Sequence, residues 1–269
     1  MTRLPTKIVE KPWGKDVLPP QFDVPEGKRI GEVWFVPPPE MPDILVKYIF
    51  TSEKLSVQVH PDDAQAKALG ESDRGKEECW LVIDAEPGAA LGIGFKQEID
   101  SEAMRAAALD GSIEQLMEWF PVQRGDFFYI PAGTVHAIGA GVSLIEIQQN
   151  SDITYRLYDY GRPRELHLEQ GLQVAKGGPH DTALRLAGAF TKSAILLSTS
   201  HFELTHVLGM PDDALLSGCD GFCLVIPVHG ACAVAGEKIL PGNCAIADSF
   251  RAITFEASAS ALLVHDANR

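Results

Sequence analysis

Short runs in which apolar and polar residues alternate make up most of the chain. Such alternation predicts β-strands with one buried face, because successive side chains on a strand point to opposite sides. Glycine, proline and aspartate separate the runs, which is typical of an antiparallel sandwich or barrel. The clearest runs in the first half lie at 31–36, 44–50, 55–60, 78–83, 126–131 and 142–149.

Two segments of the first half break this pattern. Residues 100–120 are rich in helix formers and end before a proline, which predicts a helical insertion over about 98–120. Residues 61–70 predict a shorter helix, with Asp62 or Asp63 as its N-cap. Helices are therefore expected to interrupt an otherwise β-rich fold.

The division of the chain follows from where the β-runs stop and restart. A glycine-rich, polar stretch over 169–183 separates the two groups of runs and predicts a linker. We expect a first domain at 1–168 and a C-terminal β-domain at 184–269. The predicted fold class is mainly β.

Composition and charge narrow the possible partners. The 269 residues are 45% hydrophobic and 22% charged, with a formal net charge of −14 at pH 7. This charge argues against nucleic acid and anionic membranes, and it requires a local basic cluster to hold any anionic substrate. No signal-like or membrane-spanning apolar run is present, and the five cysteines include no CxxC pair. Buried thiols and a cytoplasmic location are expected.

The most specific motif is GDFFYIPAGTVHAIG at 125–139. The spacing of its Gly125, Pro131, Gly133 and His136 resembles the second conserved motif of cupins, which are small antiparallel jelly-roll barrels. A Pro-x-Gly corner can re-aim the chain so that one imidazole points into the mouth of the barrel. We therefore interpret His136 as a metal ligand.

Strand alternation supplies partners for this histidine. Gln58 and His60 share one face of a predicted strand, and Glu78 shares a face of another strand with Lys76. With His136 these residues offer two imidazole nitrogens and two oxygens. Such a set suits zinc or another first-row divalent ion with positions left open for substrate.

Two other carboxylates could replace Glu78 or extend the ligand set. Glu77 rivals Glu78, but alternation places Glu77 on the opposite strand face. The triplet from His60 to Asp62 fits the His-x-Asp pattern of a non-haem iron facial triad. However, Pro61 interrupts strand pairing, and Asp62 is better explained as a helix cap.

Six collinear motifs together resemble type I mannose-6-phosphate isomerase in its short bacterial form. They cover about residues 8–168 and read KPWG (11–14), GEVW (31–34), LSVQVHPDD (55–63), GKEECW (75–80), GDFFYIPAGTVHAIG (125–139) and IEIQQNSDITYRLYDYGRPRELH (145–167). The resemblance implies a cupin-type antiparallel jelly-roll barrel. It implies a zinc-dependent enzyme that interconverts mannose 6-phosphate and fructose 6-phosphate through a cis-enediol.

The resemblance also implies roles for particular residues. The implied metal ligands are His60, Glu78, His136 and Gln58. The implied catalytic residues are Arg156, Lys76, Glu146 and Asp152. Substrate contacts are expected from Ser56, Gln58, Lys76 and Arg156. The phosphate group would need further basic side chains, for which Arg162, Arg164 and Lys96 are candidates although each is more typical of a surface position.

The C-terminal half lacks the features of a metal site. In PGNCAIADSFRAI (241–253), Asp248 stands where a proline would follow Gly242, and no histidine comes after it. We interpret this half as a degenerate cupin-like domain with a structural or oligomer-forming role, in a monomer or small homo-oligomer. Two other functions remain compatible with the sequence: isomerisation of a related free or phosphorylated aldose, and non-catalytic sugar binding.

Overall fold

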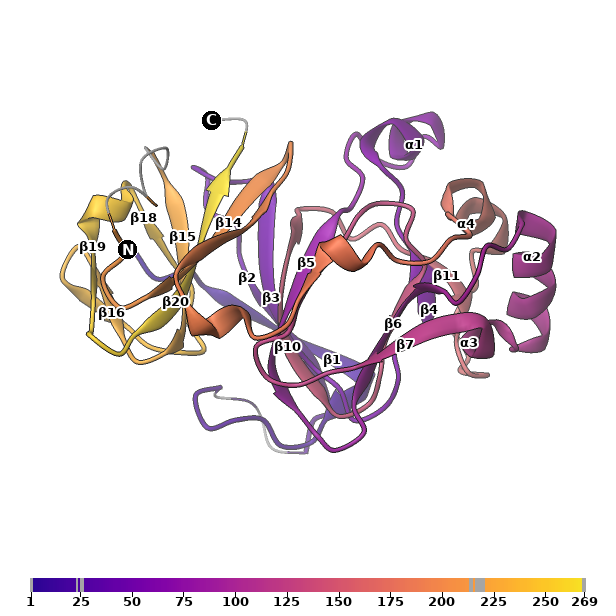
Figure 1. Cartoon of the computed structure of the whole chain (residues 1–269), viewed down its shortest axis with the longest axis horizontal. Coiled ribbons are helices and arrows are strands. Elements are labelled where there is room, and N and C mark those ends of the chain that lie inside the picture. The colour runs from indigo at the N-terminus through magenta and orange to yellow at the C-terminus, as the bar shows by residue number, and fades with distance from the viewer. Residues whose placement is uncertain (1, 23, 25–26, 213–214, 216–220, 268–269) are drawn as a thin grey trace.

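The computed structural model describes residues 2–22, 24, 27–212, 215 and 221–267. Two β-units lie side by side, and helices cover the far end of the first unit (Figure 1). All strand pairs in the four sheets are antiparallel, which confirms the mainly β, jelly-roll prediction. The first unit consists of two facing sheets and not of a closed barrel.

The larger sheet of the first unit has seven strands, in the order β1-β2-β3-β10-β5-β8-β12. These strands are β1 (Thr6–Lys15), β2 (Ile30–Phe35), β3 (Ile44–Phe50), β10 (Val142–Gln149), β5 (Glu78–Ala85), β8 (Phe127–Ile130) and β12 (Arg185–Leu186). Its central strands β3 and β10 are buried along their whole length. Both faces of these central strands are therefore covered by other parts of the molecule.

The second sheet of this unit has five strands, in the order β11-β4-β9-β6-β7. They are β11 (Tyr155–Tyr158), β4 (Val57–Val59), β9 (His136–Ile138), β6 (Ala90–Phe95) and β7 (Met117–Pro121). The helices α1 (Asp63–Ala68), α2 (Ser101–Asp110), α3 (Ile113–Leu116) and α4 (Leu168–Val174) contribute to the apolar cluster on its outer face or lie beside it. Val57 and Val59 of β4 belong to this cluster, which leaves Gln58 facing the interior between the two sheets.

Local sequence explains where these helices begin and end. Asp62 caps α1 and forms a capping box with Gln65, and Asp100 caps α2. Gly111 ends α2 in a left-handed conformation with φ of 83°, as is common at helix C-termini. The helical insertion was expected to reach residue 120, whereas Met117–Pro121 forms strand β7 and pairs with β6.

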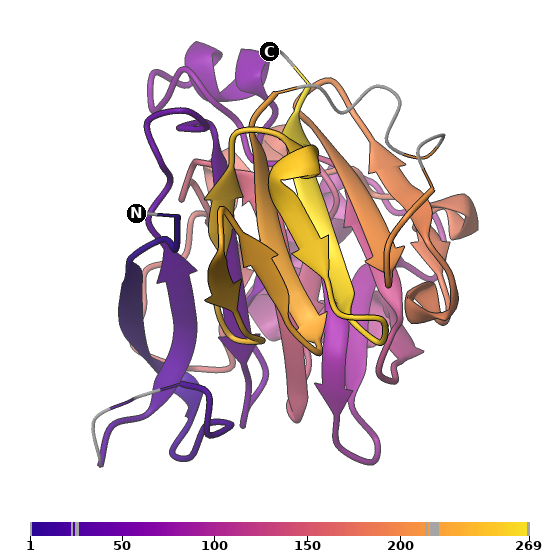
Figure 2. The same cartoon turned by 90° about the vertical axis from the view of Figure 1, so that its left-hand side faces the viewer.

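The second unit is a smaller antiparallel sandwich, which faces the viewer in Figure 2. Its five-stranded sheet contains β13 (Ala194–Ser198), β14 (Phe202–Leu208), β20 (Ser260–Asp266), β15 (Cys223–His229) and β18 (Ala245–Ala247). The three-stranded sheet contains β17 (Glu237–Ile239), β16 (Cys232–Val234) and β19 (Ile253–Phe255). The 3₁₀ turns η2 (Ala189–Thr191) and η3 (Phe250–Ala252) lie before β13 and β19.

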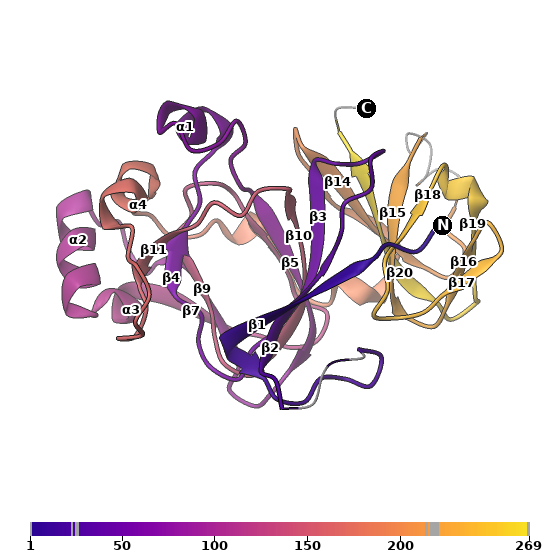
Figure 3. The same ribbon diagram turned by 180° about the vertical axis from the view of Figure 1, so that it is seen from behind.

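The two units are also connected outside their sheets. The predicted linker over 169–183 contains most of α4, part of η1 (Thr182–Leu184) and bridges to Gly94 and Thr134 of the first unit. In the opposite direction, the N-terminal segment reaches the second unit, where the Leu4 amide donates to the Cys244 carbonyl (Figure 3). The division at residues 168 and 184 stays a prediction.

One apolar core joins the units. On the outer face of the seven-stranded sheet, Tyr48, Leu81 and Ile147 are buried. They belong to the same cluster as Leu224 and Leu262 of the second unit. The seven-stranded sheet is thus packed on one side against the second unit and on the other against the five-stranded sheet.

Two further expectations concern location. Among the described residues, no helix is long and apolar enough to cross a membrane. The described cysteines, at 79, 223, 232 and 244, are buried thiols, and Cys219 lies outside the described residues.

The shared core predicts that the units unfold together. All four tryptophans lie in the first 119 residues, so their fluorescence reports on the first unit alone. We expect Leu262→Ala, in the second unit, to destabilise the protein by about 3 kcal/mol, because it leaves a cavity in the shared core. In this variant, the midpoint of urea unfolding followed by tryptophan fluorescence should fall by the same amount as the midpoint followed by circular dichroism. Leu240→Ala, at a half-exposed site, is the control, and an unmoved tryptophan midpoint in Leu262→Ala would contradict the shared core.

Candidate metal centre and substrate pocket

The candidate metal ligands come from both sheets of the first unit. Gln58 on β4 is the cross-strand partner of His136 on β9, and opposite residues of an antiparallel pair share a face. His60 directly follows β4, and Glu78 begins β5 in the facing sheet. Residues far apart in the sequence thus converge between the two sheets.

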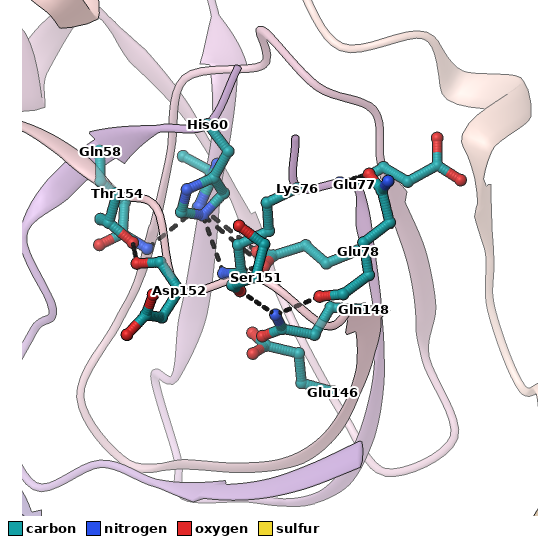
Figure 4. Close-up of polar contacts among 12 residues, drawn as sticks. Gln58, His60, Lys76, Glu77, Glu78, Glu146, Gln148, Ser151, Asp152 and Thr154 are labelled. Carbon is teal, nitrogen blue, oxygen red and sulfur yellow. Dashed lines mark hydrogen bonds and ion pairs between the residues drawn. The ribbon is translucent and has the colours of Figure 1, made fainter. Parts of the chain in front are cut away.

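His60, Glu78 and His136 form a compact, buried cluster, of which Figure 4 labels His60 and Glu78. The Nε2 atom of His60 lies 3.6 Å from Glu78 Oε2, and the Nε2 atom of His136 lies 3.4 Å from Glu78 Oε1. The potential ligand atoms of the three residues all lie within 4.8 Å of one another. Two imidazoles and a carboxylate, with further positions open, match the donor set of catalytic zinc sites.

The second nitrogen of each imidazole fixes its orientation. Nδ1 of His60 donates to the Ile153 carbonyl, and Nδ1 of His136 donates to the Thr134 carbonyl, both at 2.8 Å. Burial lowers the pKa of His136 to about 4, and burial together with the Lys76 charge lowers the pKa of His60 well below its usual value. Both rings are therefore neutral near pH 7, with the Nε2 lone pairs directed into the cluster.

Lys76 provides the positive charge beside these ligands. Its Nζ atom lies 2.5 Å from Glu78 Oε2 and donates to His60 Nε2 at 3.0 Å. Burial, followed by repulsion from Glu146, raises the pKa of Glu78, which Lys76 opposes. Glu78 Oε1 is buried and has no hydrogen-bond partner among the described residues, as expected of an atom that could accept a cation.

Glu146 lies next to this cluster but has its own partners. Its two oxygens accept hydrogen bonds from Lys47 Nζ at 3.1 Å and from Trp80 Nε1 at 3.0 Å. Although burial opposes ionisation, the Lys47 and Lys76 charges lower the pKa of Glu146. Sequence reasoning missed Lys47, although a lysine inside the apolar run ILVKYIF was a signal that it has a buried partner.

Gln58 connects the metal cluster to the pocket. Its amide nitrogen donates to His136 Nε2 at 3.2 Å, and its amide oxygen accepts from the Ser56 hydroxyl at 3.1 Å. A metal bound to His136 would take the lone pair that Gln58 now uses. Gln58 is therefore placed either to turn its oxygen towards the metal or to contact substrate, and its role as a ligand stays a prediction.

Glu77 lies on the opposite side of the strand, as alternation predicted. It points away from His60, Lys76 and Glu78 (Figure 4), and its carboxylate accepts a hydrogen bond from Tyr129 at 2.8 Å. Asp62, the iron-ligand candidate, accepts the Gln65 amide as the N-cap of α1. Neither carboxylate belongs to the candidate metal cluster.

A cavity of about 200 Å³ opens beside the cluster. This size is on the scale of a small molecule, and the lining is strongly polar. Arg156 of β11 faces it from beside Gln58, its cross-strand partner. The ionisable lining residues are Lys11, Glu32, Lys47, Lys76, Glu146, Asp152, Arg156 and Arg164, so five basic groups accompany three carboxylates.

The phosphate candidates from the sequence divide into two groups. Arg164 lines the cavity near Arg156, and its like charge adds to burial in lowering the pKa of Arg156. Arg164 is held by two 2.6 Å hydrogen bonds to Asp159. Arg162 pairs with Glu53 and Asp159, and Lys96 donates to a backbone carbonyl, both outside the cavity lining.

Two of the implied catalytic residues keep their charged groups available. The Arg156 guanidinium and the Asp152 carboxylate both line the cavity. Among the described residues, neither group has a hydrogen-bond or ion-pair partner. Both side chains can therefore contact a bound molecule without first breaking an internal ion pair.

The second unit provides no comparable cluster among the described residues. Its buried His206 is used internally, with its ring nitrogens 2.8 Å from the Lys192 carbonyl and the Ser260 hydroxyl. His229 is exposed on β15. The degenerate cupin-like character of this unit stays a prediction.

Comparison with known proteins supports the resemblance seen in the motifs. The chain is 41% identical over 171 residues to mannose-6-phosphate isomerase of Streptococcus mutans, covering 60% of this chain and 53% of the relative. It is 41% identical over 169 residues to a probable mannose-6-phosphate isomerase of Bacillus subtilis, covering 55% and 51%. The chain spans about half the length of these curated relatives. No family model matches it.

The fold is shared with solved structures over nearly the whole chain. The crystal structure of a mannose 6-phosphate isomerase from Bacillus subtilis superposes with a TM-score of 0.77 and 23% identity. The match covers 98% of this chain and 99% of that one. At this identity the match establishes the fold, including the second unit, while the curated relatives carry the resemblance in sequence.

The contacts of Lys76 predict that it competes with a bound cation. Its ammonium occupies Glu78 Oε2 and His60 Nε2, which are atoms that a metal would need. We expect Lys76→Met to destabilise the metal-free protein by about 3 kcal/mol, because Glu78 loses its buried partner. Zinc should then raise the melting temperature more than it does in the wild type. Lys96→Met is the exposed control, and an equal zinc-induced shift in all three proteins would refute the competition.

Proposed function

We propose that the chain is a metal-dependent aldose–ketose isomerase that interconverts mannose 6-phosphate and fructose 6-phosphate. The observation that carries this proposal is the buried His60–Glu78–His136 cluster beside a small, strongly charged cavity. The names of the curated relatives point to the same reaction. The predicted alternatives, another aldose substrate and sugar binding without turnover, become outcomes of the tests below.

Zinc is the proposed cofactor. His60, Glu78 and His136 would hold it, with Gln58 as the fourth protein group in reach. A bound divalent ion would act as a Lewis acid and stabilise negative charge on the substrate oxygens. The isomerisation has no redox step, so other first-row divalent ions could serve in the same donor set.

The reaction moves a proton between C2 of the aldose and C1 of the ketose through a cis-enediol. Asp152 is the proposed base for this transfer, because it lines the cavity and its carboxylate is not engaged by described residues. Glu146 is less suited to the role, since Lys47 and Trp80 already occupy its oxygens and its pKa is lowered. We assign Glu146 to holding Lys47 at the cavity wall.

Two cationic side chains would stabilise negative charge on the enediol oxygens. Lys76 can donate a proton or hydrogen bond at O1 and O2, since its ammonium borders both the metal cluster and the cavity. Arg156 stays protonated at working pH and can stabilise an oxyanion or orient the sugar. Ser56 and Gln58 line the same wall and are proposed to contact sugar hydroxyl groups.

The phosphate group is proposed to bind at the Arg156–Arg164 side of the cavity. Arginine suits this task because its planar guanidinium can bind phosphate oxygens through two hydrogen bonds. We further propose a cytoplasmic enzyme whose partner is a small phosphorylated sugar, in agreement with the buried thiols and the acidic net charge. The chain is proposed to act as a monomer or small homo-oligomer, without nucleic-acid or membrane partners.

Replacing Arg156 tests the proposed activity. We expect Arg156→Ala to lower kcat/KM for mannose 6-phosphate at least about 100-fold, because a preorganised cation next to the reacting oxygens is lost. Arg156→Lys should recover part of this loss. The measurement is a coupled assay of fructose 6-phosphate formation, with and without a chelator, and zinc should restore the chelated enzyme. Arg251→Ala, an exposed site on the second unit, is the matched control.

The outcomes of this assay separate the candidate functions. If the enzyme converts another aldose but not mannose 6-phosphate, the proposed substrate is wrong, while the assignment as an aldose–ketose isomerase stands. Sugar binding without turnover of any aldose would favour the binding-module interpretation. Unchanged activity in Arg156→Ala would reject the role assigned to this residue.

Replacing Arg164 tests the phosphate position. We expect Arg164→Gln to raise KM for mannose 6-phosphate about tenfold with little change in kcat, because the variant loses one cation at the phosphate end. Inhibition by inorganic phosphate should weaken by a similar factor. Any residual turnover of unphosphorylated mannose should stay unaltered, and an equal effect on both sugars would contradict the assignment.

A further inference from the structure

The segment before β5 positions two side chains of the candidate metal site. It runs from Gly75 to Glu77, so Lys76 lies within it and Glu78 follows directly. On one side it is attached to the start of α1: the Lys76 amide donates to the Pro61 carbonyl at 2.9 Å, and the Gly75 amide donates to Asp63 Oδ1 at 2.7 Å. The placement of Lys76 and Glu78 therefore depends on how firmly this segment is held.

Gln149, at the end of β10, holds the other side of the segment. Its backbone amide donates to the Glu77 carbonyl at 3.1 Å, and its side-chain oxygen accepts the Glu77 amide at 3.0 Å. The Gln149 side-chain nitrogen donates to Asp63 Oδ1 at 2.9 Å. One buried carboxamide thus joins β10, α1 and the ligand-bearing segment.

His201 of the second unit completes this network. It lies in the turn between β13 and β14, and its Nδ1 atom is 3.3 Å from the Gln149 side-chain nitrogen. Its Nε2 atom is 4.0 Å from Asp63 Oδ2. The backbone of His201 is fixed by hydrogen bonds with Thr199 and Ala267, so the ring is presented from a rigid turn.

We infer that His201 is a positioning residue for the candidate metal centre. Through Gln149 and Asp63 it restrains the segment 75–77 and thereby the directions of Lys76 and Glu78. Outer partners of this kind usually tune metal retention, because they limit the movement of the ligands themselves. The second unit would then have a functional task in addition to its share of the core. The inference rests on the proposed function only in that a metal binds at His60, Glu78 and His136.

Zinc release measures this role without any sugar. The zinc-loaded full chain is mixed with excess chromophoric chelator, and the rate of zinc transfer is followed by absorbance. We expect His201→Ala to release zinc about five- to tenfold faster than the wild type, with its thermal unfolding nearly unchanged. His201→Asn, which can still accept from Gln149, should release zinc more slowly than His201→Ala. His229→Ala removes an exposed histidine from the same unit and should stay within twofold of the wild type.

A second variant tests whether the effect passes through Gln149. We expect Gln149→Leu to speed zinc release at least as much as His201→Ala, since it removes the carboxamide that all partners share. The double variant should then be no faster than Gln149→Leu, because the network is already broken. In the isomerase assay, both single variants should lower kcat several-fold with little change in KM.

The possible results separate this inference from the proposed function. Zinc release in His201→Ala within twofold of the wild type, or multiplicative effects in the double variant, would overturn the positioning role. If His201→Ala releases zinc faster but the wild-type chain does not isomerise mannose 6-phosphate, the positioning role is supported and the proposed activity is rejected. Failure of the wild-type chain to bind zinc would overturn both.

Discussion

The central strands of the seven-stranded sheet are buried on both faces, and the rest of the structure depends on this constraint. Strand alternation must sort its side chains into two sets, because one face meets the second unit and the other meets the five-stranded sheet. Tyr48, Cys79 and Ile147 fill the shared core on the outer face. Lys47 and Glu146 face inwards, where charged groups are tolerated only when they compensate one another. The apolar core and the charged site are thus two faces of the same strands.

Charge compensation also explains how the inner face can hold so many ionisable groups. Two buried ammonium groups, Lys47 and Lys76, lie at ion-pair distance from two buried carboxylates, Glu146 and Glu78. A set of this kind contributes little net stability, since desolvation offsets much of the attraction. It does keep strong donors and acceptors in fixed positions, which is the arrangement that electrostatic stabilisation of a transition state requires. The buried imidazoles remain neutral in the same surroundings and keep their lone pairs for a metal.

The sequence predicted what depends on local pattern and missed what depends on distant pairing. Alternation correctly separated Glu78 from Glu77, because direction within one strand is a local property. The predicted helical insertion over about 98–120 was too long at its C-terminal end, because Met117–Pro121 forms a strand through its pairing with β6. Lys47 was missed for a similar reason: its partner Glu146 becomes visible only through the register between β3 and β10. His201 could not be found from the sequence, because its contact with Gln149 requires the packing of one unit against the other.

The acidic surface and the basic cavity are compatible because electrostatic interactions in salt solution are short-ranged. At physiological ionic strength the Debye length is about 8 Å, so most of the charges behind the net −14 are screened from the cavity. The groups that a bound anion experiences are those that line the cavity, where basic side chains outnumber carboxylates. Arg156 matters most in this balance, because it is not engaged by a carboxylate at ion-pair distance among the described residues, whereas Asp159 holds Arg164. The cavity thus combines a local excess of positive charge with a neighbouring cluster that could hold a metal ion.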